Sequence, residues 1–331
     1  MGKMLKPKIK VGRIIFDILK VVCVISIFVA VIYSIPPLFK HKEVVAKSEI
    51  VTIPKKTEIA SKKGSIDVLM IGNSSVYSGF NPLQMWKEHG YTSFSAAAPK
   101  QNMCLSYYTF KEILTVQNPK VLLLDISNLF ETRGTTSIKE NLQLVYTYSY
   151  PVFRDTSRWD EIQSKGVVQT KTESLRLVAR GFYYSPDIVA NTKGYNYMKE
   201  TNEVEDLPEY SKTYLPKIMQ LAKENNVSVV FTSIPCSTTW SYKRHNAAVK
   251  VAEEYNVDFI DMNIPGTVSD INWNIDSRDG GNHLNYNGSQ RITTYVGNYL
   301  KQTYQLSDYR GNENFTDWDE DYALFKKRIK Q

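Results

Sequence analysis

The sequence predicts an α/β fold, a three-layer αβα sandwich around a parallel sheet, preceded by one N-terminal transmembrane helix. Beyond residue 65, short apolar runs alternate with amphipathic stretches, which is typical of parallel strands connected by helices. Near the amino terminus lies an apolar run that is long enough to cross a bilayer. The 331 residues are 42% hydrophobic and 23% charged, a composition that supports a sizeable core.

The apolar runs and the patterns between them define the expected elements. Strand–helix alternation of this kind implies right-handed crossovers between parallel strands. Strands are expected at 66–71, 91–96, 119–126, 227–234 and 257–262. Helices are expected at 82–89, 105–117, 211–225, 244–255 and 287–302.

An aromatic-rich segment at about 130–207 interrupts this alternation. It shows no clear strand pattern and contains stretches such as "LVYTYSYPVFRDTSRW". We expect a partly helical insertion in the sheet domain. It either covers the sheet or provides an aromatic wall for an extended substrate such as a glycan.

Residues 1–39 are expected to form a basic cytoplasmic tail and a membrane anchor. Lysines precede the apolar run from Ile14 to Ile35, which predicts a cytoplasmic amino terminus. The alternative is a cleaved signal peptide, but the run exceeds a signal core and no small-residue cleavage site follows it. Residues 40–63 then form a lysine-rich spacer, and residues 64–331 form an extracytoplasmic domain held at the cell membrane.

The charge distribution argues against a nucleic-acid partner. The net charge of +7 comes from the lysines and the arginine of residues 1–63, so the domain that follows is near neutral. Cys104 and Cys236 could pair in an oxidising compartment, although two cysteines do not establish a disulfide framework. No metal-ligand spacing and no glycine-rich phosphate loop occurs, so neither a metal nor a cofactor is expected.

The stretch "VLMIGNSSVYSGF" places Ser74 just after the first strand. Gly, Asn and Ser are common in turns, but ligands of open α/β sheets bind at this carboxyl edge. A serine nucleophile needs a histidine base. His283 lies in a turn-rich loop before the last helix, whereas His41 is in the spacer, His89 is at a helix end and His245 is expected on the surface of a helix.

This order of motifs resembles the SGNH (GDSL-like) hydrolase superfamily, over about residues 65–305. Gly72-Asn73-Ser74 matches the nucleophile block, with Asn73 in place of the usual aspartate, and the resemblance implies a flavodoxin-like sheet. "HLNYNGSQRITTYVGNYL" resembles the ending of membrane-anchored members. Those members include the DltD-like and the alginate or cellulose acetylation proteins, which partner membrane-bound O-acyltransferases.

The resemblance implies a Ser74–His283–Asp triad, but the spacing of the acid departs from the family. Gly280, not an acid, stands three residues before His283. Asp279 is the expected third member, because a Gly280-Gly281 bulge could bring it back to the histidine. Asp276 is the fallback acid.

Oxyanion or substrate contacts are expected from loops that follow the second and third strands. The candidates are Gln101, Asn102 and Asn128. For Asn128, a helix cap or a turn residue is the alternative.

The implied activity is acyl transfer, most simply acetyl transfer, to hydroxyls of a cell-surface polysaccharide through an acyl-enzyme. A multi-span membrane-bound O-acyltransferase would supply the acyl group. The alternatives are a carbohydrate esterase of the same fold, or a non-catalytic scaffold for the membrane acyltransferase.

Overall fold

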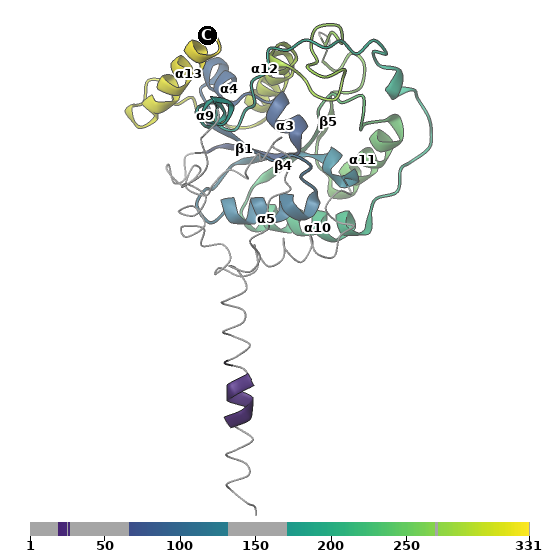
Figure 1. The fold of residues 1–331 in the computed structure, drawn as a ribbon, viewed down its shortest axis with the longest axis vertical. Coiled ribbons are helices and arrows are strands. Elements are labelled where there is room, and N and C mark those ends of the chain that lie inside the picture. Colours follow the sequence, from purple (N-terminus) through teal and green to yellow (C-terminus); the bar gives the residue numbers. More distant parts are fainter. Residues whose placement is uncertain (1–18, 25, 27–65, 132–170, 269–270, 331) are drawn as a thin grey trace, which may run out of the picture. The chain divides into compact units, whose positions relative to one another are not determined.

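A computed structural model describes residues 19–24, 26, 66–131, 171–268 and 271–330 of the protein (Figure 1). Residues 19–24 and 26 are helical. From residue 66 onward, the described chain forms an α/β domain built on a parallel sheet.

The sheet has five parallel strands in the order β2-β1-β3-β4-β5, with β1 and β3 in its interior. This is the strand order of a flavodoxin-like sheet. Each strand overlaps its predicted range, which confirms the parallel α/β prediction. The strands are β1 (Val68–Gly72), β2 (Ser93–Ala97), β3 (Val121–Asp125), β4 (Ser228–Ser233) and β5 (Phe259–Asp261).

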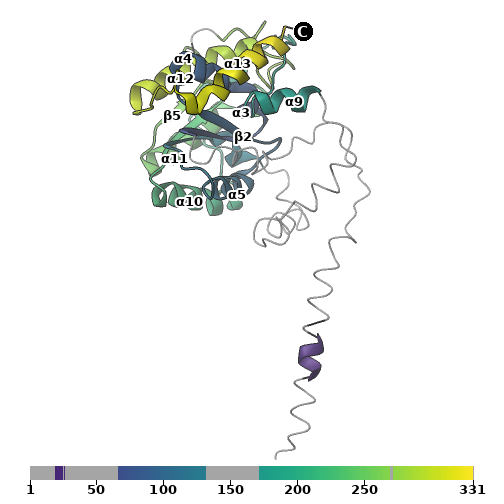
Figure 2. The same ribbon diagram turned by 90° about the vertical axis from the view of Figure 1, so that its left-hand side faces the viewer.

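Helices cover both faces of the sheet, so the domain has three layers (Figure 2). Successive side chains of β1 alternate between two apolar cores, because residues of a strand point to opposite faces. One core includes α5 (Met103–Ile113), α10 (Glu209–Glu224) and α11 (Tyr242–Tyr255). The other includes α3 (Ser74–Gly79), α4 (Pro82–His89) and α12 (Tyr286–Thr303).

A third apolar cluster joins α4 to α9 (Lys171–Val178) and α13 (Thr316–Arg328). Trp86 of α4 stacks on Trp318 of α13, with ring centroids 5.4 Å apart. Helix α13 was not predicted from the sequence, because its polar composition hides the short apolar face formed by Trp318 and Phe325.

Several predictions fall outside the described residues. These are most of the span from Ile14 to Ile35, the spacer at 40–63 and residues 132–170 of the insertion. Within the described ranges, none of the helices has the length and apolar character needed to cross a membrane. The described part of the insertion contains helix α9 and no strand. Cys104 and Cys236 are both free and buried, so they do not pair.

Candidate active site

The chain turns sharply between β1 and α3, and Ser74 is the first residue of that helix. Asn73 caps the helix, since its side-chain oxygen accepts a hydrogen bond from the backbone N–H of Ser75 at 2.8 Å. Gly72 has no room for a side chain, because an added Cβ would lie 2.2 Å from Val76 Cγ2 and 2.6 Å from Asp125 Cβ. The turn therefore places a partly buried serine at the carboxyl end of β1. The N–H of Ser74, at the first helical position, has no partner within the helix.

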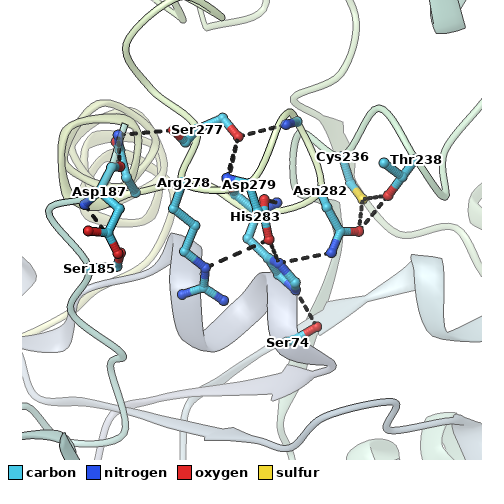
Figure 3. A network of polar contacts seen from close by, with 12 residues as sticks. Ser74, Ser185, Asp187, Cys236, Thr238, Ser277, Arg278, Asp279, Asn282 and His283 are labelled. Atoms are coloured by element: carbon cyan, nitrogen blue, oxygen red, sulfur yellow. Dashed lines mark hydrogen bonds and ion pairs between the residues drawn. The ribbon is translucent and has the colours of Figure 1, made fainter. Parts of the chain in front are cut away.

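Ser74 and a distant loop that carries Asp279 and His283 contribute three side chains to a continuous hydrogen-bonded chain (Figure 3). Ser74 Oγ lies 2.7 Å from His283 Nε2, and His283 Nδ1 lies 2.5 Å from Asp279 Oδ2. With its Nδ1 proton donated to the carboxylate, the imidazole keeps a lone pair on Nε2 for the hydroxyl proton. This is the arrangement of a nucleophile, a base and the group that orients the base.

The loop that carries His283 bends back on itself and so returns Asp279 to the histidine. Gly280 and Gly281 have φ angles of 75° and 99°, a left-handed region that glycine adopts without strain. Ser277 Oγ accepts hydrogen bonds from the N–H groups of Gly281 (2.7 Å) and Asp279 (3.3 Å). Asp279 Oδ1 also accepts the backbone N–H of His283 at 2.7 Å, so both carboxylate oxygens hold the histidine.

The carboxylate of Asp279 is held in its charged form. Partial burial opposes ionisation, but the hydrogen bonds from His283 and the charge of Arg278 outweigh it and lower the pKa of Asp279. The fallback acid, Asp276, lies elsewhere. It is fully buried, accepts the backbone N–H of Asn272 at 2.6 Å and pairs with Arg291 at 2.9 Å.

A partly buried series of hydrogen bonds lies behind the nucleophile turn and was not predicted from the sequence. Asn73 Nδ2 donates to Ser127 Oγ at 3.1 Å, and Ser127 Oγ lies 2.9 Å from Asp125 Oδ2. Asp125 ends β3 and is completely buried, which raises its pKa to about 7 despite hydrogen bonds from Ser127. The sequence signal that could have indicated this arrangement is an acidic residue, Asp125, at the carboxyl end of a central strand.

The three oxyanion candidates lie near one another but are not joined to Ser74 by any hydrogen bond among the described residues. Gln101 Nε2 (3.3 Å) and Asn128 Nδ2 (3.1 Å) both donate to Ser106 Oγ, and the carbonyl oxygens of these two amides have no partner there. Asn102 caps α5 by accepting the N–H of Leu105. The roles of all three in binding an oxyanion remain predictions.

Further residues support the histidine loop from the turn after β4. Thr238 Oγ1 donates to Asn282 Oδ1 at 2.5 Å, and Asn282 Nδ2 lies 3.0 Å from His283 Nδ1. Because Nδ1 has one hydrogen-bonding position and the shorter contact is to Asp279, we assign that position to the carboxylate. Asn282 then packs beside the ring and limits its rotation.

The prediction that His245 lies on the surface was wrong. Its Nδ1 lies 2.8 Å from the buried carboxylate of Asp261, which also accepts the indole N–H of Trp240. The periodicity of the helix that carries His245 does not reveal a partner such as Asp261, which lies at the end of β5. In the part of the chain that the structure describes, no group of three His, Cys, Asp or Glu side chains converges as metal ligands do.

The domain is therefore an α/β protein with a parallel sheet and a Ser-His-Asp constellation at the carboxyl end of β1. Its fold is similar to that of a "putative acylhydrolase" from Bacteroides fragilis NCTC 9343, at 11% identity and a TM-score of 0.38, over 75% of this chain and 94% of that one. It is also similar to a "GDSL-like lipase" from Bacteroides thetaiotaomicron VPI-5482, at 14% identity and a TM-score of 0.36, over 75% and 96% of the two chains. No protein-family model and no curated protein matches the sequence. At these TM-scores, neither likeness says what this chain acts on.

Proposed function

We propose that the protein is an SGNH-type serine acyltransferase that moves an acetyl group to hydroxyls of a cell-surface polysaccharide. The observation that carries the proposal is the chain from Ser74 Oγ through the imidazole of His283 to the carboxylate of Asp279. A serine side chain is a weak nucleophile until an adjacent base accepts its proton.

The proposed reaction has two steps that use the same histidine. In the first, His283 takes the proton of Ser74, whose Oγ attacks the carbonyl carbon of an acyl ester or thioester. The bond to the leaving group breaks and His283 returns the proton to that group. In the second, an acceptor hydroxyl gives its proton to His283 and attacks the acyl-serine, which releases the new ester and restores the Ser74 hydroxyl.

Charge that develops on the carbonyl oxygen needs hydrogen-bond donors. The backbone N–H of Ser74 is one, because it stands at the amino end of α3 without a helical partner. The amides of Gln101 and Asn128 are proposed as further donors, after a rotation that releases them from Ser106.

The identity of the acceptor separates a transferase from an esterase, because the residues that form the acyl-enzyme are the same. We favour a polysaccharide acceptor because the sequence predicts an anchored, extracytoplasmic domain with an aromatic-rich insertion. Acyl donors are cytoplasmic, so the proposal includes a multi-span membrane-bound O-acyltransferase as the partner that supplies the group. A scaffold without catalysis is the competing function.

The test follows acetyl groups from an activated acetyl ester, with the full-length chain, in the presence and absence of oligosaccharides. Mass spectrometry would detect acetylated sugar and free acetate in parallel. The proposal predicts acetylated sugar with wild-type protein and with Ser75→Ala, a change at the neighbouring serine, and none with Ser74→Ala or His283→Ala. Acetate release alone, lost in Ser74→Ala, would establish an esterase, and the absence of any Ser74-dependent turnover would support the scaffold.

A further inference from the structure

We infer that Arg278 forms an anion-binding subsite beside Ser74, one that takes a carboxylate or phosphate group of the substrate. The inference rests on the proposed function and names a class of substrate for it. The acceptor or the acyl donor would carry an acidic group close to the hydroxyl or ester that reacts.

The guanidinium of Arg278 is mostly buried and makes no hydrogen bond to any residue that the structure describes. The side chain is 13% exposed, and its Nη1 atom is buried without a partner. An arginine side chain carries five N–H donors. Buried donors are nearly always paired, so a buried guanidinium nitrogen without a hydrogen-bond partner beside a candidate catalytic site indicates a missing partner.

The nearest acid does not supply that partner. Asp279 Oδ2 is 3.9 Å from Arg278 Nε, beyond hydrogen-bond distance. Both oxygens of Asp279 already accept hydrogen bonds from His283. If Arg278 served only to orient Asp279, its N–H groups would be expected on that carboxylate. The 3.9 Å separation between Arg278 and Asp279 leaves the N–H groups of the guanidinium available to another anion.

Stacking also holds the guanidinium of Arg278 in place, and the side chain points toward the nucleophile. Figure 3 shows the side chain of Arg278 running beside His283, toward the helix that carries Ser74. It lies over the ring of Tyr183, 4.5 Å from the centroid, and Tyr183 in turn contacts Tyr77 of α3 at 5.8 Å between ring centroids. The backbone N–H of Tyr183 donates to Tyr77 O at 2.7 Å, which ties this stack to α3.

A stacked guanidinium of this kind suits a carboxylate or a phosphate. Its planar fork can donate two parallel hydrogen bonds to either group, and stacking removes in advance much of the side-chain freedom that binding would cost. Because Arg278 runs beside His283 and stacks on Tyr183, which contacts α3, a bound anion would lie on the same side of the site as Ser74. Where the acceptor carries the acidic group, the favoured polymer is acidic rather than neutral.

The kinetic test compares two acetyl esters that differ in one charge, 4-acetoxybenzoate and methyl 4-acetoxybenzoate, with full-length protein. We expect wild-type protein to prefer the carboxylate ester, and Arg278→Gln to lower the ratio of the two kcat/KM values by about tenfold to a hundredfold. Arg278→Lys, which keeps the charge but not the fork, should lie between them. An equal loss on both esters would overturn the inference and make Arg278 a positioning residue for Asp279.

A second measurement does not depend on catalysis or on the folding of Arg278→Gln. In the Ser74→Ala protein, which cannot form an acyl-serine, calorimetry should show tighter binding of 4-acetoxybenzoate than of its methyl ester. Benzoate and phenyl phosphate, titrated separately against the bound ester, distinguish a carboxylate site from a phosphate site. Equal binding of the charged and neutral esters would overturn the anion subsite. If neither ester is turned over by wild type but the charge preference in binding holds, the acyltransfer proposal fails and the subsite stands.

Discussion

Ser74 Oγ and His283 Nε2 lie 2.7 Å apart although 209 positions separate the two residues in the sequence. The parallel sheet brings them together, because Ser74 follows the carboxyl end of β1 and the His283 loop leads into α12, which packs on the same face as α3. This short contact thus brings residues from the beginning and from the end of the domain's sequence together at one site.

The two candidate acids should separate into one that affects turnover and one that affects stability. Asp279→Asn keeps the size of the side chain but removes the charge that holds the histidine, so we expect kcat to fall by about 10³–10⁴-fold with little change in melting temperature. Asp276→Asn removes the charge that faces Arg291 and should lower the free energy of unfolding by about 1–3 kcal/mol. Thermal unfolding and ester hydrolysis of both variants check this. A larger loss of turnover per folded molecule in Asp276→Asn would contradict the assignment.

Asn102 should behave as a helix cap. Its side chain accepts the N–H of Leu105 at the start of α5. Asn102→Ala should therefore cost about 1 kcal/mol of stability, and Asn102→Ser, which can still cap, should cost less. Chemical denaturation measures both. If both variants are fully stable but lose turnover alike, Asn102 contacts the substrate instead.

Gly72 should not tolerate a side chain. A methyl group at this position would collide with Val76 and with Asp125, directly beneath the nucleophile turn. We expect Gly72→Ala to destabilise the domain by about 1–3 kcal/mol and to displace Ser74, which lowers turnover as well. Measured stability and turnover equal to those of wild type would show that the turn relaxes freely.

The buried carboxyl of Asp125 predicts a pH-dependent stability. Its pKa in the folded protein is about 7, above the ordinary value, so folding favours the protonated form. The folded state holds a proton that the unfolded chain releases between about pH 4 and 7, and stability contributed by this group falls as the pH rises through that range. Asp125→Asn removes the titration, so its melting temperature should fall less than that of wild type between pH 5 and pH 8. An identical fall in both proteins would contradict the raised pKa.

The sequence supports the architecture well, because β1, β3 and β4 are built on runs of apolar residues and each long helix has a clear period. The helix predicted at 82–89 matches α4, where Asn81 and Pro82 mark the start and Gly90 marks the end. Shorter elements were not foreseen. Helix α3 has only six residues, "SSVYSG", and its stability comes from the Asn73 cap and its packing rather than from a periodic pattern.

The site was less predictable than the fold, because its geometry depends on contacts across loops. Residue types and positions relative to strands pointed to Ser74 and His283, but the choice between Asp279 and Asp276 turns on two left-handed glycines. The hydrogen bonds from Asn73 through Ser127 to Asp125 depend on side-chain directions, which a sequence pattern does not contain. The same holds for the buried Nη1 atom of Arg278, which has no hydrogen-bond partner.

In the proposed reaction Ser74 carries an acyl group, and trapping that intermediate is the decisive measurement. Full-length protein would be mixed with an activated acetyl ester, quenched in acid within the first turnovers and digested for mass spectrometry. We expect one acetyl group on the peptide that contains Ser74, in wild type and in Ser75→Ala. In Ser74→Ala we expect neither the acetyl group nor turnover. Wild-type turnover by Ser74→Ala, or acetyl on a different side chain, would contradict it.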